Sequence, residues 1–164
     1  MLINTLFHVA IKTRDLKRTE QFYVVVFGMR VDERPAIGFP GIWLRHTLPG
    51  GTALFHIYAG DAAKEADGSF AFGGGAVDHI SLIAHGFRDF REQFRRYGLR
   101  WRENVVPEAG LWQLFVYDPS GVLLELTFSA AAEGHEAPQI PSELQYKPRE
   151  NFFCAEDYDQ FSGV

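Results

Sequence analysis

The chain contains an internal duplication, and this feature limits its possible folds more than any other. Three pairs of matching residues have nearly the same separation: His8 and His79 by 71 positions, Gly28 and Gly98 by 70, and His56 and Glu125 by 69. Each half shows the pattern of a strand, a helix and three further strands. A repeat of this kind indicates two copies of one supersecondary unit, each of which needs the other to bury its apolar surface.

The first half, residues 5–59, illustrates the pattern. Residues 6–12 alternate apolar and polar side chains, as a strand with one buried face does. A helix is predicted to follow, beginning after a cap at Thr13 or Asp15 and ending at Gly28. Three strands complete this half, and the last two are joined across residues 49–51.

The remaining segments complete the predicted architecture. Residues 60–76 contain five glycines and little periodicity, so we expect a linker. Residues 77–129 repeat the order of the first half. A single module leaves one face of a four-stranded sheet bare, so the two modules are expected to curve around a shared cavity within one domain, residues 1–130. The aromatic-rich residues 130–164 are predicted to form an extension that packs on this domain or on a partner subunit.

Four polar residues interrupt otherwise apolar strands: His8, His56, His79 and Glu125. Side chains alternate between the two faces of a strand, so each of these should point away from the core and toward the cavity. Three imidazoles and a carboxylate at one place would bind one divalent metal ion, such as Fe, Ni, Zn or Mn. Taken singly, each residue also fits a structural role, such as a salt bridge from Glu125 to Lys12 or Arg45.

Composition restricts the possible partners. The formal net charge of -5 disfavours a nucleic-acid-binding surface. The single cysteine, Cys154, cannot form an internal disulfide. No run of 18 apolar residues and no basic region before an apolar N-terminal segment occurs. We expect a cytoplasmic homodimer that acts on a small-molecule substrate, without nucleic-acid or membrane partners.

Three segments resemble the vicinal oxygen chelate superfamily: HVAIKTRDLKRTEQFYVVVFGMRV, VDHISLIAHGFRDFREQFRRYGLRW and LFVYDPSGVLLEL. This superfamily includes glyoxalase I, methylmalonyl-CoA epimerase, fosfomycin-resistance enzymes, extradiol dioxygenases and bleomycin-resistance proteins. The resemblance covers about residues 5–130. It implies an α+β fold of two βαβββ modules, with His8, His79 and Glu125 as metal ligands around the cavity. His56 stands where glyoxalase-like members carry Glu or Gln.

The role of His56 separates two reaction classes. If His56 is a ligand, two metal positions stay open for adjacent substrate oxygens, and His56 could act as the base of a lyase or isomerase. If His56 is not a ligand, the other three residues form the 2-His-1-carboxylate set of iron(II) dioxygenases. The absence of His between Glu92 and Asp118 disfavours an ordinary extradiol mechanism. A metal-free small-molecule or drug-binding resistance protein is the third possibility.

Other side chains near the predicted ligands are candidates for substrate contact. The candidate substrate-binding residues are Trp43, Tyr58, Trp112, Gln113 and Phe115. Tyr117 is a second candidate catalytic residue in addition to His56. The aromatic members fit a place in the core equally well. Aromatic residues make up 15% of the chain, which favours an apolar or aromatic substrate. His46 and His85 are expected at the surface.

Overall fold

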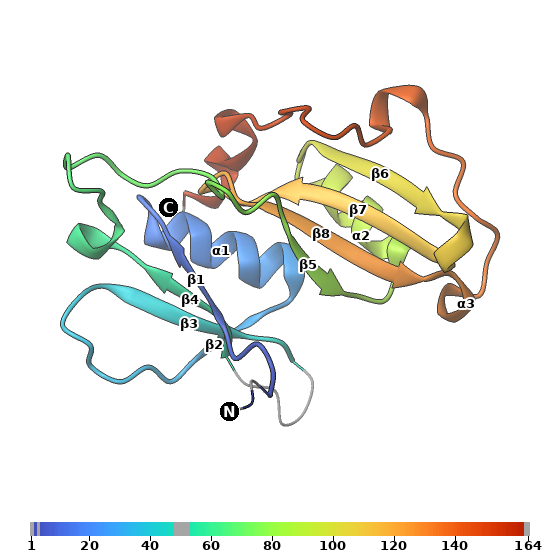
Figure 1. Cartoon of the computed structure of the whole chain (residues 1–164). Helices are drawn as coiled ribbons and strands as arrows, with labels where there is room; N and C mark the ends of the chain where they lie inside the picture. Colours follow the sequence, from blue (N-terminus) through green and yellow to red (C-terminus); the bar gives the residue numbers. More distant parts are fainter. Residues whose placement is uncertain (1, 3, 48–52, 163–164) are drawn as a thin grey trace. The chain divides into compact units, whose positions relative to one another are not determined.

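The computed structural model describes residues 2, 4–47 and 53–162, so the predicted connection at residues 49–51 lies outside the described residues. The chain divides into two compact units, Met1–Phe72 with Phe161–Val164 and Gly73–Gln160. The boundary between the units falls inside residues 60–76. Each unit has a four-stranded mixed sheet with a helix against one face (Figure 1).

The sheet of the first unit has the strand order β1-β4-β3-β2. Strands β1 and β4 are parallel, whereas β3 is antiparallel to both β4 and β2. The elements are β1 Val9–Lys12, α1 Leu16–Phe27, β2 Arg30–Asp32, β3 Gly41–Arg45, β4 Ala53–Tyr58 and the short 3-10 helix η1 Gly60–Ala63. The predicted order of strand, helix and three strands is confirmed, although β1 and β2 are shorter than expected.

Local sequence explains the limits of α1. The Asp15 side chain accepts a hydrogen bond from the backbone N–H of Arg18, as an N-cap does, and Gly28 ends the helix at a φ of 65°. One face of α1 is apolar and covers the sheet, where the rings of Tyr23 and Phe55 lie 5.2 Å apart. The core of this unit is therefore on the helix side, and the opposite face of the sheet is available for a site.

The second unit repeats this arrangement with the strand order β5-β8-β7-β6. Its elements are β5 Ile80–Ile83, α2 Phe87–Arg96, β6 Trp101–Val106, η2 Pro107–Ala109, β7 Leu111–Tyr117, β8 Leu123–Ser129, α3 Ala130–Glu133 and η3 Ser142–Leu144. The 3-10 helix η4 Ala155–Phe161 also belongs to it, except for its last residue, Phe161. Strands β5 and β8 are parallel, as β1 and β4 are. The equal strand orders confirm the predicted pair of βαβββ modules.

Helix α2 covers the core face of the second sheet. Phe87 packs edge-on against Phe128 of β8, with ring centroids 5.3 Å apart. The backbone N–H groups of Gly86 and Phe87 both donate to the carboxylate of Glu133, at 2.9 and 2.8 Å. Residues from α3 thus cap α2, because the first N–H groups of a helix have no partner inside it.

The C-terminal extension docks on the second unit. Residue Gln145 bridges to Glu103 on the edge strand β6, and the N–H of Tyr146 donates to the Glu103 carbonyl at 2.8 Å. Further along, Arg102 forms a salt bridge with Glu150 at 2.7 Å. Figure 1 shows this segment running beside β6. The extension therefore protects the exposed edge of the sheet.

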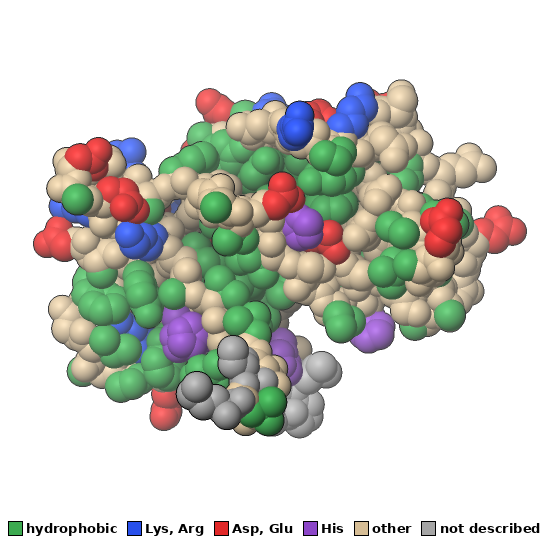
Figure 2. All heavy atoms as spheres, viewed as in Figure 1, with side chains coloured by type: hydrophobic (Ala, Val, Ile, Leu, Met, Phe, Trp, Pro, Cys, Tyr) green, Lys and Arg blue, Asp and Glu red, His purple; other side chains and the backbone are tan. Residues whose placement is uncertain are grey.

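Two surface properties complete the description. On the face drawn in Figure 2, Lys and Arg side chains are interspersed with acidic ones. Among the described residues, no helix has the length and apolar character needed to cross a bilayer.

Candidate metal centre and ligand face

The candidate ligands of the second unit are His79, immediately before β5, and Glu125, in the middle of β8. Ser81 pairs with Glu125 in the register of these strands, and alternation along the chain puts His79 on the same face. Nε2 of His79 lies 3.1 Å from Oε2 of Glu125. Glu125 is only 6% exposed. The structure thus brings these two predicted ligands together, on the sheet face opposite α2.

Neighbouring side chains orient this pair. The Ser81 hydroxyl donates to Oε1 of Glu125 at 2.8 Å, and the Thr127 hydroxyl donates to the same oxygen. Oδ1 of Asp78 lies 2.7 Å from Nδ1 of His79. A carboxylate beside Nδ1 favours a proton on that nitrogen, so Nε2, on the side of Glu125, is the nitrogen that could bind a metal. Metal ligands typically have such outer hydrogen bonds, which fix their orientation.

Replacing Ser81 by Ala tests this orientation. Loss of the hydroxyl removes one of the two hydrogen bonds that Oε1 of Glu125 accepts, so we expect metal affinity to fall roughly 10-fold, at the low end of the effect of outer hydrogen bonds. Competition with a chelating dye measures the affinity. Ser142→Ala, which removes an exposed hydroxyl in η3, is the matched control. Equal affinities of the two variants would refute the role of Ser81.

In the first unit, His8 and His56 lie on the corresponding face. Their ring centroids are 3.7 Å apart and their planes differ by 14°. Trp43, paired with His56 across β3 and β4, stacks on the other side of His56 at 4.3 Å. His56 is 6% exposed. Burial lowers the pKa of His56, and the nearby His8 and Arg34 lower it further. His56 is therefore a neutral imidazole at pH 7, enclosed in a stack of three rings.

The stack determines how well each histidine fits a metal. An imidazole binds a metal through a lone pair in the plane of its ring. Two rings stacked face to face cannot both direct their lone pairs at one ion, so one ring must turn first. Nδ1 of His8 is buried without a hydrogen-bond partner among the described residues, whereas His56 is held between two rings. As the structure stands, His8 fits a metal better than His56 does.

The two pairs occupy equivalent positions in the duplicated sheets. His8 and His79 precede the first strand of each module, and His56 and Glu125 lie on the strand parallel to it. In the part of the chain that the structure describes, no three His, Cys, Asp or Glu side chains form a group able to hold a metal. The site with four ligands therefore stays a prediction, to which each unit contributes two donors.

Four of the five predicted substrate-binding residues lie on these ligand-bearing faces: Trp43, Tyr58, Gln113 and Phe115. The fifth, Trp112, lies on the opposite face of β7. Trp112 is 3% exposed and packs against Phe87 of α2, with ring centroids 5.4 Å apart. Within LWQLFVY, Trp112 shares a wholly apolar face with Leu114 and Val116, whereas Gln113 marks the opposite face, so strand alternation could have placed Trp112 in the core. The structure assigns Trp112 to the core and away from the ligands.

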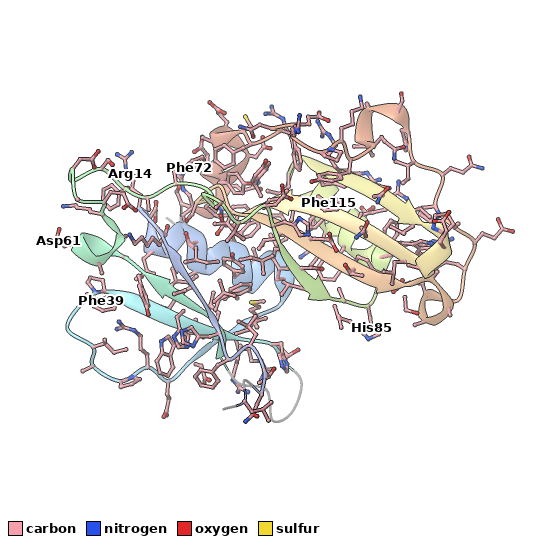
Figure 3. The ribbon with its side chains drawn as sticks, in the orientation of Figure 1. Arg14, Phe39, Asp61, Phe72, His85 and Phe115 are labelled. Atoms are coloured by element: carbon pink, nitrogen blue, oxygen red, sulfur yellow. The ribbon has the colours of Figure 1, made fainter. Side chains whose placement is uncertain are left out.

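The extension contributes a residue to the ligand face that the sequence analysis did not identify. Tyr146 stacks on Phe115, with ring centroids 3.8 Å apart and planes at 9°. Phe115, labelled in Figure 3, is consequently only 2% exposed. Burial raises the pKa of Tyr146, and the nearby acidic groups of Asp78 and Glu125 add to this effect. Tyr146 therefore replaces Phe115 as the accessible ring on this face. The only feature of the sequence that could have indicated this role is the aromatic content of the C-terminal extension.

The predicted catalytic residue Tyr117 also lies on this face. Burial, with a smaller contribution from Asp78, raises the pKa of its phenol. Its ring packs against Phe152 of the extension at 4.8 Å, and its carbonyl accepts a hydrogen bond from the Tyr158 hydroxyl at 2.7 Å. The extension thus positions Tyr117 as well as covering Phe115.

Fold and site together define a class of protein with two βαβββ modules, each of which presents a pair of candidate metal ligands on the bare face of its sheet. The family model of the Glyoxalase/Bleomycin resistance protein/Dioxygenase superfamily matches residues 5–126. The chain belongs to this superfamily, which confirms the resemblance seen in the sequence. No curated protein matches the chain.

Solved structures share the fold at low sequence identity. A putative glyoxalase family protein from Bacillus anthracis is 16% identical with a TM-score of 0.61, covering 79% of this chain and 98% of that one. The genomically encoded fosfomycin resistance protein FosX from Listeria monocytogenes is 18% identical with a TM-score of 0.57, and the match covers 77% of this chain and 94% of that one. Lactoylglutathione lyase from Agrobacterium tumefaciens is 15% identical with a TM-score of 0.57, and the match covers 79% of this chain and 96% of that one. At these identities the likeness shows the fold alone.

Proposed function

We propose that the protein is a divalent-metal-dependent enzyme that acts on a small oxygenated substrate through two adjacent oxygens, with proton transfer of the lyase or isomerase type. The observation that carries this proposal is the oriented pair of His79 and Glu125 at the position equivalent to His8 and His56 in the other repeat. Both pairs consist of metal-binding groups, and both lie on the sheet face opposite the helix. In this proposal the two pairs bind one ion.

A bound divalent ion would polarise a substrate carbonyl or stabilise negative charge on adjacent oxygens. The protein's own residues have the remaining tasks. Ser81 and Asp78 hold Glu125 and His79 in place. Tyr117 and Tyr146 present phenol groups near Asp78, where they can donate hydrogen bonds to substrate oxygens. Because their pKa values are raised, both phenols stay protonated at pH 7 and act as donors.

The stack around His56 favours a second candidate function. If His56 stays between Trp43 and His8, the metal ligands reduce to His8, His79 and Glu125. This 2-His-1-carboxylate set is typical of iron(II) oxygenases, including extradiol-type ring-cleaving dioxygenases. As a neutral imidazole, His56 would then be able to accept a proton from a bound substrate.

A metal-free binding or resistance protein is the remaining alternative. It would explain the aromatic side chains Trp43, Tyr58 and Tyr146. It does not explain why Ser81 and Thr127 both direct their hydroxyls at the carboxylate of Glu125. Burying a carboxylate is costly, and a cation bound beside Glu125 and His79 would offset this cost.

Metal analysis tests the proposed function. Protein purified without chelator is expected to contain about one equivalent of Fe, Ni, Zn or Mn, and EDTA is expected to lower its melting temperature, because a metal stabilises the folded state to which it binds. Readdition of the metal should restore the melting temperature. A protein without metal whose melting temperature is unchanged by EDTA would leave the metal-free alternative.

Oxygen consumption then distinguishes the two enzymatic candidates. Bound iron with oxygen uptake in the presence of catechol would favour the dioxygenase. Nickel, zinc or manganese without oxygen uptake would favour proton transfer. A parallel His56→Ala variant reports the role of this residue, since metal content should fall if His56 is a ligand and stay constant if it is not.

A further inference from the structure

The loop between β2 and β3 places an arginine on the ligand-bearing face of the first unit. The Arg34 guanidinium lies over the ring of Phe39, at 5.0 Å from its centroid. Phe39 in turn packs edge-on against Tyr58, two residues after His56 (Figure 3). The charge on Arg34 also reaches His56, whose pKa it lowers. Arg34 therefore belongs to the surroundings of the His56 stack.

Gly41 shows on which side of the sheet Arg34 lies. Alternation along β3 puts Gly41 on the same face as Trp43, and Trp43 stacks on His56. A Cβ atom built on Gly41 would lie 3.4 Å from Nη2 of Arg34. The same Cβ would lie 2.3 Å from the carbonyl oxygen of Ile57, so no side chain larger than that of glycine fits between this strand and the guanidinium. The guanidinium thus lies beside Gly41, and its contact with Phe39, which packs on Tyr58, places it near the ligand-bearing face.

This face contains several buried nitrogen atoms without acceptors. Within the described part of the chain, the N–H donors Nε and Nη2 of Arg34 and Nε1 of Trp43 are buried and have no hydrogen-bond partner. Buried polar groups in folded proteins almost always have partners, and an unpaired one costs about 1–3 kcal/mol, more if it is charged. Further such atoms lie elsewhere in the described chain, but the three on Arg34 and Trp43 are N–H donors of neighbouring residues, which points to an acceptor from outside the chain.

The two unpartnered nitrogens of Arg34 specify the kind of acceptor. Nε and Nη2 form one edge of the guanidinium, whose two parallel N–H groups match two oxygens of a carboxylate or phosphate-type group. The neighbouring acidic residue Asp32 lies beside Arg45, with Oδ1 3.5 Å from Nε. An anionic ligand is therefore the acceptor that fits both the geometry and the positive charge.

We propose that Arg34 binds a substrate oxyanion, so that the substrate carries a carboxylate or a phosphonate or phosphate group in addition to its adjacent oxygens. This inference deepens the proposed function, because it names the substrate class of the same face. Trp43 supplies a further N–H donor, and the rings of Phe39 and Tyr58 provide apolar surroundings that strengthen the interaction with the charge. In this proposal Arg34 is the residue that determines specificity.

Binding of small anions to metal-free protein tests the proposal separately from the metal. EDTA-treated protein is titrated with phenylphosphonate, benzoate and uncharged benzamide at constant ionic strength, with tryptophan fluorescence as the readout. We expect one or both anions to bind at least roughly 10-fold more tightly than benzamide, as charge-assisted bidentate hydrogen bonds provide. The anion with the larger preference identifies the oxyanion as a phosphonate type or a carboxylate.

Three variants assign the preference to Arg34. Arg34→Met keeps much of the side-chain length and should lose the preference for anions. Arg34→Lys keeps the charge without the parallel N–H pair, and should retain only part of it. Arg30→Met removes an exposed arginine of β2 and should bind like the wild type. Circular dichroism tests whether each variant is folded. If Arg34→Met is unfolded, the partial loss of anion preference in Arg34→Lys tests the role of Arg34 instead.

The outcomes separate this proposal from the proposed function. Wild-type protein without a preference for anions, or an Arg34→Met variant that keeps the preference, overturns the role of Arg34 whatever the metal content. Anion binding that depends on Arg34 in a protein that never retains metal supports the oxyanion site and overturns the metal-dependent enzyme. Metal content should be equal in Arg34→Met and wild type, since Arg34 is not a ligand.

Discussion

His79→Ala is expected to abolish stable metal binding, whereas His85→Ala leaves it unchanged. His79 supplies one of the two donors that meet at 3.1 Å in the second unit, and its removal leaves Glu125 with an alanine as neighbour. Loss of an outer hydrogen-bond partner already costs about 10–100-fold in metal affinity, so loss of a ligand should cost more than roughly 100-fold. Metal content after gel filtration and competition with a chelating dye both measure this effect.

His85 is a matched control because it is an exposed histidine just beyond the other end of β5 (Figure 3). Replacing His85 by Ala removes the same imidazole group as His79→Ala does, but at a position away from Glu125. If both variants retain metal equally, the pair of His79 and Glu125 is not a metal site. If both lose metal equally, the effect does not arise from coordination by His79.

Glu103→Leu is expected to destabilise the fold by about 3 kcal/mol, near the lower end of the range for breaking a buried ion pair. Glu103 lies on β6 with no exposed surface. Its Oε1 lies 2.9 Å from Nε of Arg91 on α2 and accepts a hydrogen bond from Nε1 of Trp101 at 2.8 Å. The substitution leaves both donors without an acceptor. The lower end applies because Arg91 keeps some contact with water, at 24% side-chain exposure.

Urea unfolding followed by circular dichroism measures this cost. The double variant Arg91→Met with Glu103→Leu should recover part of the stability, because an apolar pair of similar volume can replace a buried ion pair. Glu108→Leu, at an exposed position in η2, is the control and should change stability by less than about 0.5 kcal/mol. A double variant less stable than Glu103→Leu would show that Arg91 stabilises the fold without Glu103.

The buried pair of Glu103 and Arg91 also shows where sequence patterns mislead. Alternation in WRENVV puts Glu103 on the same face as Trp101 and Val105, and a charge at such a position contradicts the usual apolar pattern. The partner of Glu103 is Arg91 on a different element, α2. Periodicity within one strand gives no information about a partner on another element. Only the packing of α2 on the sheet makes this charge a structural feature.

The candidate site divides in a similar way. His79 and Glu125 were predictable because each is a lone polar residue in an apolar strand, and strand alternation determines the face of the sheet on which it lies. Trp112 was misassigned, although Gln113 marks the polar face of β7 and alternation puts Trp112 on the other face with Leu114 and Val116. Arg34 and Tyr146 reach the ligand faces from a loop and from the C-terminal extension, and no periodicity constrains such segments.

By itself, the sequence determined the two-fold repeat, the order of elements in each βαβββ module and the superfamily, because hydrophobic periodicity, helix caps and the spacing of the repeat are local properties of the chain. Tertiary structure alone decided that His56 is enclosed between Trp43 and His8, that Tyr146 covers Phe115, and that Nε and Nη2 of Arg34 lie buried and unpaired beside Gly41. These contacts join segments that the sequence separates, and their energies depend on distances and burial that exist only in the folded chain.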